Sequence, residues 1–411
     1  MRLALPDPRV EVRGAAWLEG GLPHRLPAWV RPQLPDDFAA MVEAQPAGVR
    51  LRFRTAARSV RLDVRVLRVA VAPQPPAAPQ PYGLLVDGAE VAGAAAGESG
   101  VVDLEPVRGT TVERPGPVTS VELALGGDGR SVRDVEVWLP HGETTTLVAL
   151  DADADIEPPS PVAAPRWVHH GSSISHGAGA DTPLGTWPAV AARAAGLDLV
   201  NLGFSGNALL DPFVARAIRD QRADVITLKL GINVVNHDAM RLRSFVPAVH
   251  GFLDTVREGH PTTPVVVVSP LLCPLVEDTP GPTSLDPADP TVFRTSGHPS
   301  EVADGKLSLT VIRSALERVV ASRADAALTY VDGLSLYGWP EWDALPMRDL
   351  LHPDAPAHRL IGTRFAAVLA DLLAESADRA SDLAEDALPH LTELVGGDEP
   401  ALVEVDRLRE P

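Results

Sequence analysis

Residues 166–177, Arg-Trp-Val-His-His-Gly-Ser-Ser-Ile-Ser-His-Gly, decide the fold, because a short apolar run here leads into a loop of small polar residues. Further apolar runs follow and alternate with patterns of helical period. One run, Val265–Val268, is apolar throughout, as parallel strands buried between helix layers are. Strands that alternate with helices over about 210 residues predict an open α/β sheet. The expected strands are Arg166–His170, Asp198–Leu202, Asp224–Leu230, Pro264–Ser269 and Leu328–Asp332, and the expected helices are Thr186–Ala195, Pro212–Gln221, Asp238–Glu258, Lys306–Arg323 and Ala355–Glu375.

The chain before this stretch has the pattern of β structure. In Val49–Arg54 apolar residues alternate with arginines, so the period of two predicts a buried apolar face and places Arg50 and Arg52 in water. The pair Asp87-Gly88 between apolar runs predicts a two-residue hairpin. Other short runs lie at Val60–Val66, Val118–Leu125, Val132–Leu139 and Thr145–Leu150. Short strands interrupted by glycine and proline predict an all-β sandwich or jelly roll.

These patterns divide the chain into three parts. We expect a β-sandwich domain over residues 1–157, the α/β domain over 166–375 and an acidic extension over 376–411. Residues 151–165 are first acidic and then rich in proline, which indicates a semi-stiff linker. The extension carries leucines at an amphipathic spacing. The sequence leaves open whether it docks on the protein or joins two copies into a homo-oligomer.

Composition excludes several classes of protein. The chain has 411 residues and a formal net charge of −19, so it repels phosphate backbones and anionic lipid surfaces, and we expect no nucleic-acid partner. Its single cysteine, Cys273, excludes an internal disulfide and a four-cysteine zinc site. No stretch of about 18 apolar residues and no export signal occurs, so we expect no membrane insertion and a cytoplasmic location.

Small polar loops follow the expected strands. Gly171–Gly177 follows the first strand, Asn201–Asn207 the second and Gly231–Asn233 the third, while Asp349–Pro353 precedes the last helix. Because ligands bind at the carboxyl ends of strands in open α/β sheets, we expect these loops to meet at one site.

The residue types in these loops suit acyl transfer. A serine hydroxyl needs a base to remove its proton, and a histidine oriented by a carboxylate is such a base. Asp349 and His352 fit, because a non-helical turn of three residues returns the acid to the imidazole, and Pro353 disfavours helical geometry at His352. An oxyanion also needs hydrogen-bond donors, which the N–H groups of Ser173 and Gly206 and the side chain of Asn233 can supply.

These loops, in this order and spacing, resemble the SGNH (GDSL-like) hydrolase superfamily of serine esterases and lipases. The resemblance covers residues 166–375 and implies a flavodoxin-like α/β/α three-layer domain. It implies Ser173 as the nucleophile, His352 as the base, Asp349 as its orienting acid, and Gly206 and Asn233 as oxyanion donors. This chain departs from the family in having Gly171-Ser172-Ser173 where Gly-Asp-Ser is frequent, so hydrogen bonding around the nucleophile differs. The β domain resembles the N-terminal jelly roll of two-domain SGNH esterases, some of which act on acetylated carbohydrates.

Other serines and histidines compete for these roles. Ser175 is interpreted as a helix cap, and Ser205 stands in no Gly-x-Ser-x-Gly motif, which disfavours an α/β-hydrolase. His169 and His170 are adjacent on a strand and point to opposite faces, so they cannot hold one metal together.

Two further segments concern the substrate. Trp339 and Trp342 stand shortly before Asp349, and we hypothesise that at least one of them lines the acyl- or sugar-binding site, although packing is the alternative. The proline-rich segment Leu271–Glu301 follows the fourth strand, so it is placed to border the site and to set substrate choice.

The sequence therefore predicts a serine ester hydrolase that forms an acyl-enzyme on Ser173 and needs no metal or organic cofactor. Its substrate is expected to be a small molecule with a short acyl ester, such as an O-acetyl group of a carbohydrate or metabolite. Two alternatives stay open: an acyltransferase that uses the same three residues, and a catalytically inactive carbohydrate-binding protein.

Overall fold

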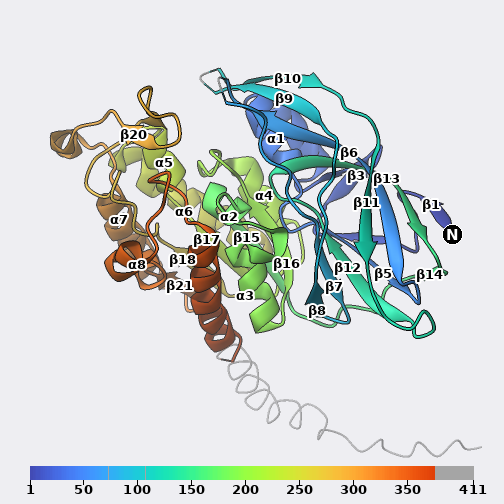
Figure 1. Ribbon diagram of the computed structural model, residues 1–411. Coiled ribbons are helices and arrows are strands. Elements are labelled where there is room, and N and C mark those ends of the chain that lie inside the picture. Colours follow the sequence, from blue (N-terminus) through green and yellow to red (C-terminus); the bar gives the residue numbers. More distant parts are fainter. Residues whose placement is uncertain (73, 107, 375–411) are drawn as a thin grey trace, which may run out of the picture. The chain divides into compact units, whose positions relative to one another are not determined.

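The strands expected after residue 166 form one sheet in the computed structural model, which describes residues 1–374 except 73 and 107 (Figure 1). They are β15 (Arg166–Gly171), β16 (Asp198–Gly203), β17 (Val225–Lys229), β18 (Val265–Val268) and β21 (Leu328–Val331). Within this part of the chain the order is β16-β15-β17-β18-β21, and every pair is parallel. This is the flavodoxin-like order 2-1-3-4-5, so the predicted α/β sheet is confirmed.

Helices cover both faces of this sheet. Trp167 of β15 packs with Trp187 of α3 and Phe365 of the closing helix, which runs over the described residues 355–374. His170, which is also on β15 but points to the other face of the sheet, stacks on Phe252 of α6. The other elements of this domain are α2 (Ser173–His176), η2 (Pro183–Gly185), α3 (Trp187–Ala195), α4 (Pro212–Arg219), α5 (Ile232–Asn236), α6 (Leu242–Gly259), β19 (Thr283–Leu285), β20 (Phe293–Thr295), η3 (Pro299–Asp304), α7 (Leu309–Ser322), η4 (Gly333–Ser335) and α8 (Trp339–Ala344).

Two predicted helices begin later than expected: α7 starts at Leu309 rather than at Lys306, and α6 starts four residues late. The sequence pattern extends α6 back to Asp238, but the helix starts at Leu242. The reason for α6 is local, because α5 already occupies Ile232–Asn236 and Asp238 has a φ of +49°, which no right-handed helix accommodates.

Residues before β15 form the predicted sandwich. Two sheets pack face to face around a core that includes Leu51 and Phe53 from one sheet and Leu62 and Val64 from the other. Among the described residues, one sheet has the order β1-β13-β6-β9-β10 with β11 beside β6, and the other has β14-β5-β12-β7-β8 with β2 beside β5. The strands are β1 (Arg2–Ala4), β2 (Glu11–Arg13), β5 (Arg50–Thr55), β6 (Ser59–Ala70), β7 (Gly83–Val86), β8 (Ala89–Val91), β9 (Gly100–Glu105), β10 (Thr110–Arg114), β11 (Thr119–Ala124), β12 (Arg133–Trp138), β13 (Glu143–Ala152) and β14 (Ile156–Glu157).

Three further elements accompany the sandwich. They are a hairpin of β3 (Trp17–Glu19) and β4 (Leu22–His24), the 3-10 helix η1 (Ala28–Gln33) and the helix α1 (Asp37–Ala44). The predicted turn at Asp87-Gly88 is confirmed. Its φ values of +50° and +78° are those of the type I′ turn that joins β7 and β8.

Two sequence-based expectations about the sandwich are wrong. Arg50 and Arg52, expected in water, are only 4% and 8% exposed, because the outer face of β5 lies against acidic partners. The predicted linker over residues 151–165 is also partly strand. Asp151 and Ala152 end β13, and β14 pairs with β5 and buries Ile156 in the core.

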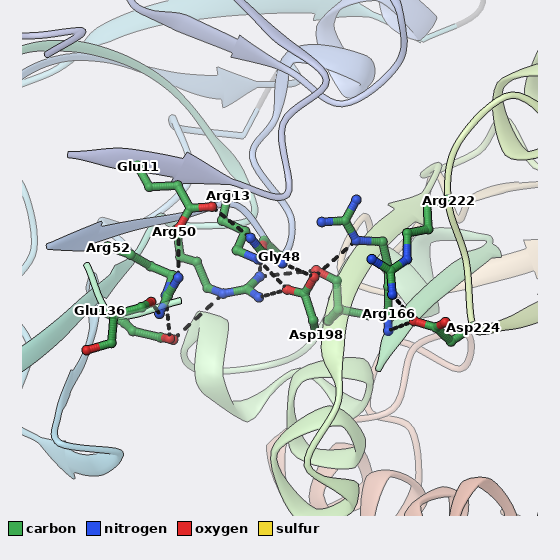
Figure 2. A network of polar contacts seen from close by, with 12 residues as sticks. Glu11, Arg13, Gly48, Arg50, Arg52, Glu136, Arg166, Asp198, Arg222 and Asp224 are labelled. Carbon is green, nitrogen blue, oxygen red and sulfur yellow. Dashed lines mark hydrogen bonds and ion pairs between the residues drawn. The ribbon is translucent and has the colours of Figure 1, made fainter. Parts of the chain in front are cut away.

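A network of ion pairs joins the sandwich to the parallel sheet (Figure 2). The carboxylate of Asp198, at the start of β16, accepts hydrogen bonds from Nε of Arg13 at 2.7 Å, from Nη2 of Arg50 and from Nε of Arg166 at 3.1 Å. Burial alone would raise the pKa of Asp198, but these three guanidinium groups lower it below its usual range. Asp198 therefore stays charged and ties β2 and β5 to β16.

Residues Met1–Ala367 form one compact unit. The domain boundaries that the sequence predicts at residues 157 and 166 lie inside this unit, and they stay predictions. The predicted extension over residues 376–411 lies outside the described residues. No helix in the described part of the chain has the length and apolarity that crossing a membrane requires.

Candidate active site

Ser173 opens α2 directly after β15. The hydroxyl of Ser172 accepts a hydrogen bond from the N–H of Ile174 at 3.3 Å, so Ser172 is the N-cap, and the interpretation of Ser175 as the cap is wrong. Gly171 is required here, since a Cβ on it would lie 2.3 Å from Oγ of Ser175. Ser173 itself is half-buried, with its hydroxyl at the carboxyl edge of the sheet.

The structure brings Ser173, His352 and Asp349 together. Oγ of Ser173 lies 2.9 Å from Nε2 of His352, and Nδ1 of that imidazole lies 2.6 Å from Oδ2 of Asp349. The Nδ1–H donates to the carboxylate, which leaves Nε2 to accept the proton of the serine hydroxyl. This is the arrangement in which a histidine can deprotonate a serine.

The loop that carries the acid and the base is held in shape by its own backbone. Oδ1 of Asp349 accepts the N–H of Leu351 at 2.9 Å and that of His352 at 2.7 Å. Leu350 between them has a φ of +69°, the left-handed conformation that closes so tight a turn. Burial would raise the pKa of Asp349, but the hydrogen bonds and charge of His352 and the N–H of Leu351 lower it below its ordinary value. Asp349 is therefore ionised at neutral pH.

Cys273 supports this loop from behind. Its thiol is 1% exposed and donates to the carbonyl oxygen of Leu350 at 3.3 Å. Burial raises the pKa of Cys273 to about 12, so the group stays a thiol near neutral pH. A buried thiol with a raised pKa is a structural group rather than a reactive one.

Three N–H groups are available to an oxyanion. No hydrogen bond within the described residues uses the backbone N–H of Ser173 or Gly206, or the Nδ2 of Asn233. Oδ1 of Asn233 accepts the N–H of Ala208 at 3.1 Å, which fixes the orientation of the amide. Gly206 has a φ of +70°, which favours glycine. That these groups bind an oxyanion stays a prediction.

A second serine–histidine pair lies two residues further along α2. Oγ of Ser175 lies 2.8 Å from Nε2 of His169, and Nδ1 of His169 lies 2.6 Å from the hydroxyl of Thr227. His170 points away from them and bonds the carbonyl oxygen of Leu202 at 2.8 Å. The prediction that His169 and His170 point to opposite faces is confirmed. In the described part of the chain, no group of three or more histidine, cysteine or acidic side chains could hold a metal ion.

The proline-rich segment Leu271–Glu301 borders the site, as the sequence suggested, through the hairpin β19–β20. The N–H of Phe293 donates to the carbonyl oxygen of Asp349 at 2.9 Å. The ring of Phe293 meets the imidazole of His352 edge-on at a centroid distance of 5.6 Å. The only sequence signal for this residue was an aromatic side chain in a segment otherwise rich in proline and polar residues.

Phe38 and His237 are further residues at the site that the sequence did not reveal. A Cβ on Gly206 would lie 2.8 Å from Cε1 of Phe38, so the ring of Phe38, from α1, lies against the glycine. Nε2 of His237 lies 2.9 Å from the carbonyl oxygen of Gly206, to which it donates. Phe38 comes from the β-rich part of the chain, where no sequence pattern indicated a contact with the α/β loops.

Trp339 and Trp342 lie on α8. Trp339 is 55% exposed, and within the described residues no hydrogen bond or ring contact joins either indole to Ser173 or His352. Their expected role in substrate binding stays a prediction.

This chain is similar to several known proteins. Residues 165–272 match the GDSL-like lipase/acylhydrolase family. Salicylyl-acyltransferase SsfX3 from a tetracycline biosynthetic pathway is 27% identical, with a TM-score of 0.70 over 90% of this chain and 97% of that one. A putative GDSL-like lipase from Bacteroides ovatus is 16% identical, with a TM-score of 0.64 over 91% and 98%. A family two carbohydrate esterase from Cellvibrio japonicus is 13% identical, with a TM-score of 0.55 over 90% and 97%. No curated protein matches the sequence.

Proposed function

We propose that this chain, whose residues 165–272 belong to the GDSL-like lipase/acylhydrolase family, is a serine ester hydrolase that cleaves short acyl esters. The observation that carries the proposal is the chain of hydrogen bonds from Ser173 through His352 to Asp349, with distances of 2.9 Å and 2.6 Å. An unbroken chain of this kind also favours an enzyme over a catalytically inactive carbohydrate-binding protein.

The reaction would proceed in two steps. Oγ of Ser173 attacks the ester carbonyl carbon while Nε2 of His352 takes the hydroxyl proton, and Asp349 stabilises the imidazolium that forms. The N–H groups of Ser173, Gly206 and Asn233 bind the oxyanion. His352 then protonates the leaving alcohol, and a water molecule repeats the sequence on the acyl-enzyme, which releases the acid and restores Ser173.

O-acetyl groups of carbohydrates or small metabolites are the first substrates to test. The support for this substrate class is the carbohydrate esterase from Cellvibrio japonicus, which has the same fold over 90% of this chain. Neither a metal ion nor an organic cofactor takes part in the proposed steps.

The test is a panel of 4-nitrophenyl esters of graded acyl length and of acetylated sugars, run on wild type and on Ser173→Ala. Ser173→Ala should fold normally and lose turnover by about 10⁶-fold, because the nucleophile is gone. Ser175→Ala is the matched control on the same helix, and it should retain turnover. Near-wild-type activity of Ser173→Ala with the best ester would refute the proposal.

Transfer of the acyl group to an alcohol other than water is the second candidate function. Its support is the likeness to a salicylyl-acyltransferase, which at 27% identity is closer in sequence than the carbohydrate esterase. Product analysis with added alcohols and sugars separates the two functions. A new ester formed at millimolar acceptor identifies a transferase, and free acid alone identifies a hydrolase.

A further inference from the structure

Two phenylalanine rings contact groups that the proposed reaction uses, and they come from different parts of the chain. Phe38 lies on α1 and contacts Gly206, whereas Phe293 lies on β20 and contacts His352. Both side chains are half-buried, so each retains surface that no described residue covers.

Phe38 is held firmly in place. Asp36 caps α1 by accepting the N–H of Ala39 at 2.8 Å, and the N–H of Phe38 donates to the carbonyl oxygen of Gly109 at 2.9 Å. Ala39 and Val42 anchor the helix, with exposed fractions of 0% and 1%. In Figure 1, α1 lies on the side of the sandwich that adjoins the α/β domain. The β-rich region thus presents an aromatic ring to the glycine expected to bind the oxyanion.

The mechanism assigns different parts of the ester to the two rings. His352 must protonate the leaving alcohol, so the alcohol lies beside the imidazole and therefore beside Phe293. The carbonyl oxygen points to the N–H of Gly206, so the acyl group, on the side away from His352, lies beside Phe38.

We propose that Phe38 is a specificity-determining residue that favours a flat, aromatic acyl group over an aliphatic ring of the same size. An aromatic pair prefers offset or edge-to-face contact and gains attraction beyond its buried area, which an aliphatic ring of the same size does not. This inference rests on the proposed function, because it assumes that Ser173 is acylated.

The experiment compares three 4-nitrophenyl esters on the full chain: benzoate, cyclohexanecarboxylate and acetate. Each kcat/KM is divided by the rate of hydroxide-catalysed hydrolysis of the same ester, which removes intrinsic reactivity. Wild type should favour benzoate over cyclohexanecarboxylate by about tenfold, or about 1.4 kcal/mol. Phe38→Leu should bring this ratio close to one, and Phe38→Tyr, which keeps the ring, should restore it.

Two further variants locate the effect. Phe293→Leu should lower kcat/KM for benzoate and cyclohexanecarboxylate alike, because its ring lies on the alcohol side. Trp29→Leu is the control, because it removes an aromatic ring of the β-rich region that contacts Arg216 and not Gly206. It should change neither kcat/KM for the two esters nor their ratio.

The outcomes separate the two proposals. If Ser173→Ala is inactive but wild type shows no preference for benzoate, or keeps it in Phe38→Leu, the inference about Phe38 is overturned and the proposed function stands. If Ser173→Ala remains active, both are overturned.

Discussion

Two serines on the same short helix each hydrogen-bond an imidazole at nearly the same distance, 2.9 Å for Ser173 with His352 and 2.8 Å for Ser175 with His169. The two pairs differ in access and in the third group. Ser173 and His352 are half-buried, whereas Ser175 and His169 are fully buried. Behind His352 lies the carboxylate of Asp349, and behind His169 lies the uncharged hydroxyl of Thr227.

The difference teaches what makes such a pair chemically useful. Burial, with the nearby charges of His170 and Lys229, holds the pKa of His169 well below its ordinary value, so this imidazole resists a proton. A hydroxyl cannot stabilise an imidazolium as a carboxylate does. The Ser175 pair is therefore a packing interaction, although its distances match those of the proposed triad.

Among the variants that test this comparison, the largest effect should come from changing Asp349, the group behind His352. Asp349→Asn should lower kcat by about 10⁴-fold, since an amide no longer fixes the tautomer of His352 or stabilises its charged form. The measurement is steady-state turnover of the best ester found with the panel above. Activity within tenfold of wild type would mean that Asp349 does not orient the base.

The matched variant in the buried pair is Thr227→Val. It removes the partner of His169 and also that of the Trp167 indole N–H, which donates to Thr227 at 2.8 Å. We expect a loss of about 1–3 kcal/mol in the free energy of unfolding, measured by denaturant titration, with kcat little changed.

Loss of one oxyanion donor should lower kcat less than Asp349→Asn does. Asn233→Ala should lower kcat by about 10²–10³-fold, because one donor of several is lost while the triad stays intact. KM should change little, since the lost bond strengthens only as the oxyanion forms. A variant that changes KM alone would assign Asn233 to substrate binding instead.

The most gradual effect concerns pH. Burial lowers the pKa of His141, His170 and His358 to about 4, and the pKa values of His169 and His176 lie well below the ordinary value. Between pH of about 6.5 and 4 the unfolded chain binds protons that the folded chain does not. Stability is therefore full above pH of about 6.5 and falls as the pH drops, by up to about 1.4 kcal/mol per pH unit for each histidine.

Denaturant titrations at pH 7, 5.5 and 4.5 measure this slope. His170→Phe, which keeps a ring against Phe252, should make the slope shallower. An unchanged slope in that variant would show that His170 binds its proton as readily in the folded state as in the unfolded one.

Much of this architecture follows from local patterns. Strand and helix alternation after residue 166, the turn at Asp87-Gly88 and the spacing of Asp349 and His352 are properties of short segments, and each was readable from the sequence. The pairing of Ser173 with His352 followed from the rule that loops at the carboxyl ends of parallel strands meet.

The features that the sequence did not reveal are contacts between segments that are far apart in the chain. Arg50 reads as an exposed strand residue because nothing near it in the chain indicates that Asp198 covers it. Phe38 reads as an ordinary helix residue because its contact, Gly206, belongs to another layer of the protein. Ser175 reads as a cap because the imidazole that bonds it, His169, is recognisable as its partner only once β15 and α2 are placed.

The carboxylate of Asp198 has a consequence for how such proteins can be rearranged. A chain cut near residue 160 would leave that buried charge without Arg13 and Arg50, and would strip the ring of Phe38 from Gly206. The β-rich region therefore cannot be removed without disturbing the α/β domain. Exchanging this region between related proteins should succeed only where the new region also supplies both arginines for the aspartate and the aromatic ring for the glycine.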